Sequence, residues 1–83
     1  MISSLLEALP EFATQDSQEG EYPRYWGFAR KDGKWYIVKG TSTGGVESYR
    51  FACLSNNPLI ASYSAAWTAR VTLTYDYIYT LQI

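Results

Sequence analysis

Residues 25–39 have the sequence YWGFARKDGKWYIVK, and this stretch indicates a β-hairpin. Both halves are rich in aromatic and β-branched residues, which favour strands. Between them, Asp32-Gly33 is a pair preferred in two-residue type I′ turns. A turn at these two residues sets Arg30 opposite Trp35 and fixes the register along the whole hairpin.

In that register the hairpin has two different faces. We assign one face to the core because small residues lie opposite large ones there, which leaves neither clashes nor voids. The core face carries Gly27, Ala29, Tyr36 and Val38. The other face is a candidate binding face that mixes rings with cations: Trp26, Phe28, Arg30, Trp35 and Lys39. Such a face suits a protein interface, single-stranded nucleic acid or a sugar, unless it also packs inside a sandwich with its cations at the rim.

The chain continues from the hairpin toward a third strand. Residues 40–45 (GTSTGG) predict a flexible loop, since no Lys-Ser/Thr pair follows to indicate a phosphate site. Residues 46–54 predict a strand, and residues 55–58 (SNNP) predict a turn. Cys53 lies between apolar neighbours, which favours a buried and inert thiol.

From Tyr63 to Ile83 the sequence alternates large or apolar residues with small or polar ones. A period of two predicts extended backbone with one buried and one exposed face. Residues 71–82 therefore predict a strand, and one face of it is a candidate interface with Tyr75, Tyr77 and Tyr79. The run is long for this chain, so we expect it to bend, to break or to reach a neighbouring subunit.

Residues 59–69 leave two interpretations open. The Ser, Thr, Tyr and Trp residues favour a strand that begins the alternation, and the three alanines favour a helix. As a helix, the segment would begin after Asn57 as N-cap, with Pro58 at its first position.

The expected fold is mainly β, with about four strands in a small antiparallel sheet that forms a sandwich or a partly open barrel. The alternative is an α+β fold with a second helix at about 58–68. A single domain, 1–83, is expected because chains of 83 residues rarely divide. Within it, 1–12 predict a short helix, 13–23 an acidic arm or linker, and 24–83 the β-rich body.

The composition argues against an enzyme. Histidine is absent and there is one cysteine, so the usual general base, a Ser-His triad and a Cys/His zinc site are all missing. Asp76 interrupts a strand pattern of tyrosines and threonines and is interpreted as a solvated acid. We expect no catalytic residue, no cofactor and no metal. No segment approaches the length of a membrane span and no secretory signal is evident, so a cytoplasmic or virion location is expected.

Charge and aromatic content indicate association with protein. Net charge is −1, yet residues 1–22 carry five acids and no base, whereas residues 23–50 carry six bases. These segments are either two solvated faces or an acidic arm that covers a basic sheet. Eight Tyr, three Trp and three Phe are more than a core this small can hold.

We therefore expect a non-catalytic protein–protein association module that forms a homo-oligomer or a larger assembly. Its expected use is as a repeated structural subunit of a phage or virus virion. The pattern continues to Ile83, which favours a last strand that is paired and buried. The alternative is a small binding inhibitor or a module that binds single-stranded nucleic acid, which is possible but not favoured.

Overall fold

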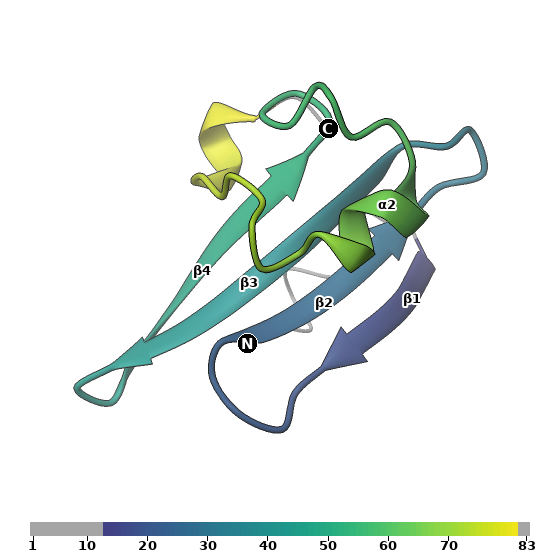
Figure 1. The fold of residues 1–83 in the computed structure, drawn as a ribbon. Coiled ribbons are helices and arrows are strands. Elements are labelled where there is room, and N and C mark those ends of the chain that lie inside the picture. The colour runs from purple at the N-terminus through teal and green to yellow at the C-terminus, as the bar shows by residue number, and fades with distance from the viewer. Residues whose placement is uncertain (1–12, 82–83) are drawn as a thin grey trace.

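The computed structural model describes residues 13–81, and its centre is a four-stranded antiparallel sheet. The strands pair in chain order, so each lies beside the next one along the sequence (Figure 1). Their bounds are Ala13–Gln18 for β1, Arg24–Ala29 for β2, Trp35–Thr43 for β3 and Val46–Cys53 for β4. The described chain then adds an α-helix, α2 (Tyr63–Thr68), and a 3-10 helix, η1 (Ile78–Thr80). The prediction of a mainly β fold with a small antiparallel sheet is confirmed; the helix predicted at 1–12 lies outside the described residues.

The turn between β2 and β3 contains three residues, not two. Arg30 N–H donates to Lys34 O (2.9 Å), and Gly33, at φ 94°, donates its N–H to Arg30 O (3.0 Å). Asp32 stabilises this longer turn, because its carboxylate accepts from Lys34 N–H (3.1 Å) and from the Arg30 guanidinium (3.0 and 2.6 Å). The hydrogen bond from Arg30 lowers the pKa of Asp32 to about 2. The extra residue shifts the register by one, so the predicted pairing of Arg30 with Trp35 was wrong.

The two-residue turn lies instead between β3 and β4. Thr43 pairs with Val46, and the two residues between them, Gly44 and Gly45, have φ values of 57° and 82°. Positive φ at both positions is the requirement of a type I′ turn, and glycine meets it without strain. The predicted flexible loop at 40–45 was therefore wrong, since β3 continues through Thr43.

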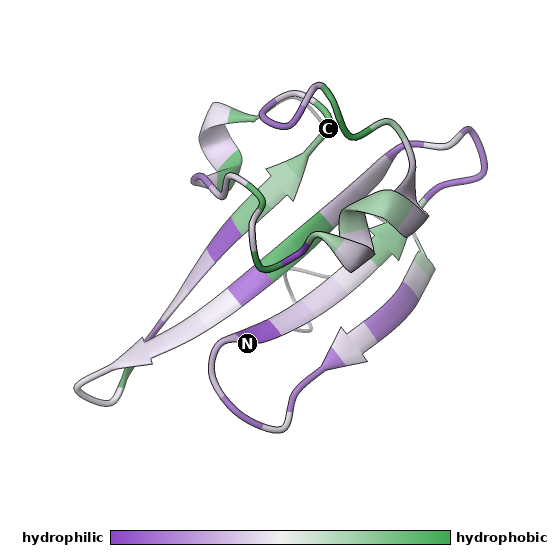
Figure 2. Cartoon of the chain, viewed as in Figure 1, coloured by the Kyte–Doolittle hydropathy of each residue, from purple (hydrophilic) through white to green (hydrophobic). Residues whose placement is uncertain are grey.

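Both faces of the sheet are buried at its centre. On what we call the Trp26 face, the buried cluster consists of Trp26, Phe28, Tyr36, Val38, Phe51 and Cys53. On the opposite Trp35 face, it consists of Tyr25, Trp35, Ile37, Ala52 and Ala66, the last from α2. Figure 2 shows hydrophobic residues in the middle of β3 and at the end of β4. The one-residue register shift produced this arrangement, because directly opposed residues share a face.

The predicted acidic arm or linker at 13–23 is partly a strand. All six residues of β1 are exposed, and Figure 2 shows several of them as hydrophilic. β1 pairs with β2 through a bulge between Thr14 and Asp16. The sequence did not predict this strand, because neither of its faces is apolar and no alternation of apolar and polar residues appears.

The segment from 59 to 81 is not a strand. Ser62 caps α2 by accepting a hydrogen bond from Ala65 N–H (3.3 Å), and the helix packs on β2 and β3. Of the two interpretations, the helix is therefore correct, although it begins at Tyr63 and not at Pro58. The strand predicted at 71–82 was wrong for its described part, which forms a single antiparallel bridge and the 3-10 helix η1.

Two asparagine side chains hold this C-terminal segment beside β4. The Asn57 amide donates to Thr74 O (3.0 Å) and accepts from Thr74 N–H (2.9 Å), as a neighbouring strand would. The Asn56 amide donates to Thr74 O (3.0 Å) and to the Asp76 carboxylate (3.1 Å). Asp76 and Phe51 then exchange two backbone hydrogen bonds of 2.7 and 2.8 Å. These bonds position the three residues from Tyr75 to Tyr77.

Replacement of Gly27 by alanine tests the packing of α2. A Cβ at Gly27 would lie 2.8 Å from a ring carbon of Tyr63 and 2.9 Å from one of Trp67. We expect Gly27→Ala to lower the free energy of unfolding by about 1–3 kcal/mol, because overpacking forces neighbours to move. Urea denaturation measures the change. Gly20→Ala is the control, since that position has no neighbour within 4 Å and should change stability far less.

Alkaline pH should destabilise the fold between pH 10 and 12. Burial raises the pKa of Tyr36 to about 12 from the ordinary value of 10.0. The unfolded chain then loses this proton first, so stability is full below pH 10 and falls as the pH rises toward 12. Urea denaturation at successive pH values should show a slope that Tyr36→Phe reduces, by up to about 1.4 kcal/mol per pH unit. An unchanged slope in Tyr36→Phe would contradict the assignment.

Candidate functional site

The candidate binding face predicted from the sequence is divided between the two sides of the sheet. Trp26 and Phe28 are buried on the Trp26 face, and Trp35 is buried on the Trp35 face. Arg30 pairs with Asp32 at the turn (2.6 Å). The five predicted residues therefore do not form one exposed surface, because the register differs from the predicted one by one residue. Lys39, the remaining member, lies opposite another cation on the neighbouring strand.

Lys39 and Arg50 lie directly opposite each other on β3 and β4. Opposed residues of an antiparallel pair point to the same side, so both cations lie on the Trp35 face. Tyr25 on β2 is the other cross-strand partner of Lys39, and the Arg70 guanidinium lies 5.9 Å from the Tyr25 ring centroid. Three cations thus cross the sheet on one face. We call Lys39, Arg50 and Arg70 the cationic row.

Aromatic rings accompany each cation of the row. Arg50 Cζ lies 3.9 Å from the Tyr77 ring centroid, and Arg50 donates to the Tyr77 hydroxyl (3.0 Å). Lys39 Nζ lies 5.4 Å from the Tyr75 centroid. Arg70 Cζ lies 4.5 Å from the Trp67 centroid. Such cation–π contacts stabilise by roughly 0.5–1 kcal/mol each at exposed sites.

No carboxylate neutralises the row within residues 13–81. The ion pair of this described part joins Arg30 to Asp32, and none involves Lys39, Arg50 or Arg70. Asp76, although next to Tyr77, pairs with Phe51 and therefore lies on the Trp26 side of β4. Like charges directly opposed on neighbouring strands are destabilising, by roughly 0.2–1 kcal/mol.

The tyrosines beside the row do not supply negative charge either. Burial raises the pKa of Tyr75 and that of Tyr25 above the ordinary value, so both phenols stay protonated at neutral pH. The Tyr75 hydroxyl donates to Arg70 O (2.7 Å). The row therefore presents positive charge next to neutral rings, which suits an anionic partner.

The three tyrosines of the predicted interface strand have different surroundings. Tyr75 is half-buried and packs against the Trp35 face. Tyr77 and Tyr79 are 51% and 74% exposed, and their rings stack with a centroid distance of 5.4 Å and an interplanar angle of 7°. Tyr77 thus links an exposed aromatic pair to Arg50. Their role at an interface stays a prediction.

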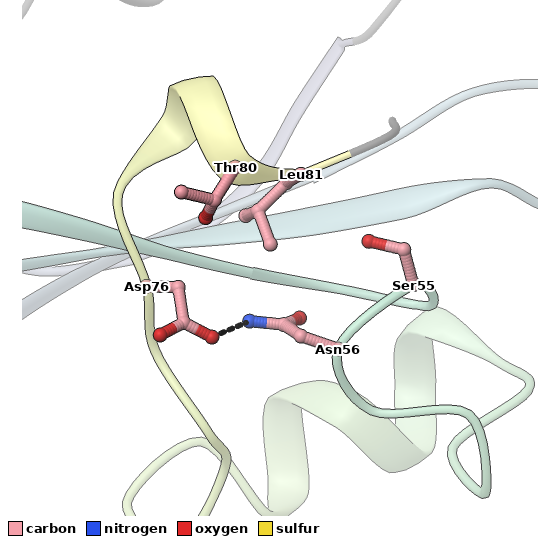
Figure 3. Close-up of a pocket in the computed structure, with 5 residues that line it drawn as sticks. All are labelled: Ser55, Asn56, Asp76, Thr80 and Leu81. Atoms are coloured by element: carbon pink, nitrogen blue, oxygen red, sulfur yellow. Dashed lines mark hydrogen bonds between the residues drawn. The ribbon is translucent and has the colours of Figure 1, made fainter.

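A hollow of about 570 Å³ lies beside the Asp76 bridge. Figure 3 shows its lining residues, with Asp76 directed toward Asn56: Ser55, Asn56, Asp76, Thr80 and Leu81. The Asp76 carboxylate accepts from Asn56 (3.1 Å), which is a structural bond that holds the segment 74–76. An apolar hollow of about 330 Å³ lies near Pro58, Ile60 and Leu73.

Other candidate chemistry is equally sparse in the described part of the chain. Cys53 is buried and its Sγ lies 3.1 Å from Ser55 Oγ. Residues 13–81 contain no group of three Cys, Asp or Glu side chains that could hold a metal ion. Within the same range, no helix is both long enough and apolar enough to cross a membrane.

Sequence reasoning found Lys39 and Tyr77 but missed Arg50 and Arg70 as members of a site. Arg50 was visible in the strand predicted at 46–54, but its pairing with Lys39 depends on the β3–β4 register. That register follows from the turn at Gly44-Gly45, which was the signal available in the sequence. Arg70 could not be placed, because it follows a helix that was not assigned.

No protein-family model matches the chain, and no match was found among curated proteins or among solved structures.

Proposed function

We propose that this protein is a non-catalytic association module that binds an acidic protein segment through the cationic row. The observation that carries the proposal is the opposition of Lys39 and Arg50 on one face without a carboxylate among residues 13–81. An anionic group from a partner would convert this repulsion into attraction on both sides. Lys39 Nζ is the most available group, since it makes no hydrogen bond to any described residue while its three N–H groups are all donors.

The neighbouring exposed rings favour a protein partner. Tyr and Arg are enriched among the residues that dominate protein interfaces. Tyr77 and Tyr79 add exposed aromatic surface to the Arg50 end of the row. Assembly into a larger structure such as a virion is part of the proposal and has its support in the composition of the chain.

Single-stranded nucleic acid is the second candidate, because it also combines negative charge with rings that stack on tyrosine. The two candidates can be distinguished by offering the row an acidic peptide and an oligonucleotide of the same charge.

A peptide of ten glutamates and an oligothymidylate of equal charge test the proposal. We expect the peptide to shift the backbone NMR signals of Lys39 and Arg50 at low salt. The double variant Lys39→Gln/Arg50→Gln should bind it about tenfold more weakly, which corresponds to a loss of about 1.4 kcal/mol. Binding should disappear near 1 M salt, where the Debye length is about 3 Å.

The matched control is Lys31→Gln/Lys34→Gln, which removes two exposed charges at the β2–β3 turn and should leave peptide binding unchanged. Equal loss in both double variants would reduce the effect to net charge and contradict the proposal. Shifts with the oligothymidylate alone would assign the row to nucleic acid.

A further inference from the structure

The loop between β1 and β2 carries exposed negative charge. Residues 19–23 are all exposed, and among them Glu19 and Glu21 form no ion pair with any described residue. The nearest acid of β1, Asp16, is occupied, because its carboxylate accepts from the Tyr63 hydroxyl (2.7 Å). The loop therefore offers two unneutralised carboxylates on a chain whose cationic row also lacks counter-charges.

The loop and the cationic row lie at the same end of the sheet. Gln18, Tyr25, Lys39 and Arg50 are successive cross-strand partners on the four strands. The loop begins directly after Gln18, so Glu19 follows the first member of this line. Despite this proximity, the described structure contains no ion pair between loop and row.

The contacts of Tyr22 explain why the loop does not reach its own row. The Tyr22 hydroxyl donates to the Glu47 carboxylate, and the Arg24 guanidinium lies 4.3 Å from the Tyr22 ring centroid. Successive side chains of β4 point to opposite faces of the sheet. Glu47 therefore points to the same side as Phe51, the Trp26 side, whereas Arg50 points to the Trp35 side. Tyr22 therefore anchors the loop toward the side of the sheet opposite to the cationic row.

We propose that the acidic partner of the cationic row is a second copy of this chain, which inserts Glu19 and Glu21 between Lys39, Arg50 and Arg70. This inference rests on the proposed function and names its partner. Charge complementarity supports it: the loop carries two unneutralised negative charges, and the row carries three positive charges.

Because Tyr22 holds the loop toward the side of the sheet opposite to the row, we expect a heterologous contact, in which one copy gives its loop to a second copy and offers its row to a third. A heterologous contact leaves one loop and one row free after each addition, and it continues until a ring closes or a filament forms. Each copy would then use both surfaces, as a repeated subunit does.

A charge-exchange experiment tests this contact. The loop-reversed variant is Glu19→Lys/Glu21→Lys, and the row-reversed variant is Lys39→Glu/Arg50→Glu. We expect the wild-type chain to associate at low salt in sedimentation experiments up to about 1 mM protein, a range that detects even millimolar Kd values. Each variant alone should stay monomeric, because its two surfaces then carry the same sign. An equimolar mixture should regain the wild-type mass, since both contacts again join opposite charges.

Two further variants guard against a trivial outcome. Arg50 also bonds to Tyr77 and to Tyr49 O, so if near-UV circular dichroism shows that the row-reversed variant is unfolded, Lys39→Glu alone replaces it. Lys31→Glu/Lys34→Glu makes the same charge change at the opposite end of the hairpin and should still associate.

The outcomes separate this inference from the proposed function. A mixture that stays monomeric, or a wild-type chain that is monomeric up to about 1 mM, overturns the second copy as partner. If the glutamate peptide nevertheless binds the row, the partner is a different acidic protein and the proposed function stands. If the peptide also fails to bind, both are wrong.

Discussion

The hydrogen bonds of two side-chain amides determine where the C-terminal third of the chain lies. Asn57 pairs with both backbone groups of Thr74, and Asn56 bonds to Thr74 O and to the Asp76 carboxylate. A buried amide that has such partners is stabilising, whereas one without them is costly. This geometry brings Tyr75 and Tyr77 to the cations of β3 and β4, although Lys39 and Tyr75 are 36 positions apart in the sequence. The placement of Tyr75 and Tyr77 beside the cations therefore depends on the turn at 55–58.

The cationic row shows how a single chain tolerates like charges without neutralising them. Repulsion between opposed cations costs roughly 0.2–1 kcal/mol. Contacts with neutral tyrosine rings offset a cost of this size, at roughly 0.5–1 kcal/mol each. The ring contacts thus offset the repulsion, while the row keeps its positive charge without an ion pair among residues 13–81. The protonated tyrosines contribute to this balance, because a neutral phenol reduces the positive potential of a cation less than a carboxylate would.

Sequence reasoning identified the β-hairpin, the third strand and the mainly β class, because these depend on residue type and alternation. It failed where a choice depends on a few local bonds. Asp32 bonds to Arg30 and Lys34 and so selects a three-residue turn over the predicted one. That single residue exchanges the faces of the hairpin and moves Trp26 and Trp35 to opposite sides. The C-terminal alternation was misleading for a related reason. The conformation of this segment depends on the bond between Asn57 and Thr74 and on the Ser62 cap of α2, and the alternation reveals neither.

The outer edge of β4 is satisfied by its own chain over much of its length. Phe51 exchanges both backbone bonds with Asp76, Cys53 N–H donates to Asn56 (2.8 Å), and Tyr49 O accepts from Arg50 (3.0 Å). At the other edge, β1 is interrupted by a bulge and carries hydrophilic side chains. Open edges are what allow sheets to template one another into amyloid. With both edges blunted in this way, the proposed contact between copies would form through side chains, and contacts of that kind can be dissolved by salt and formed again.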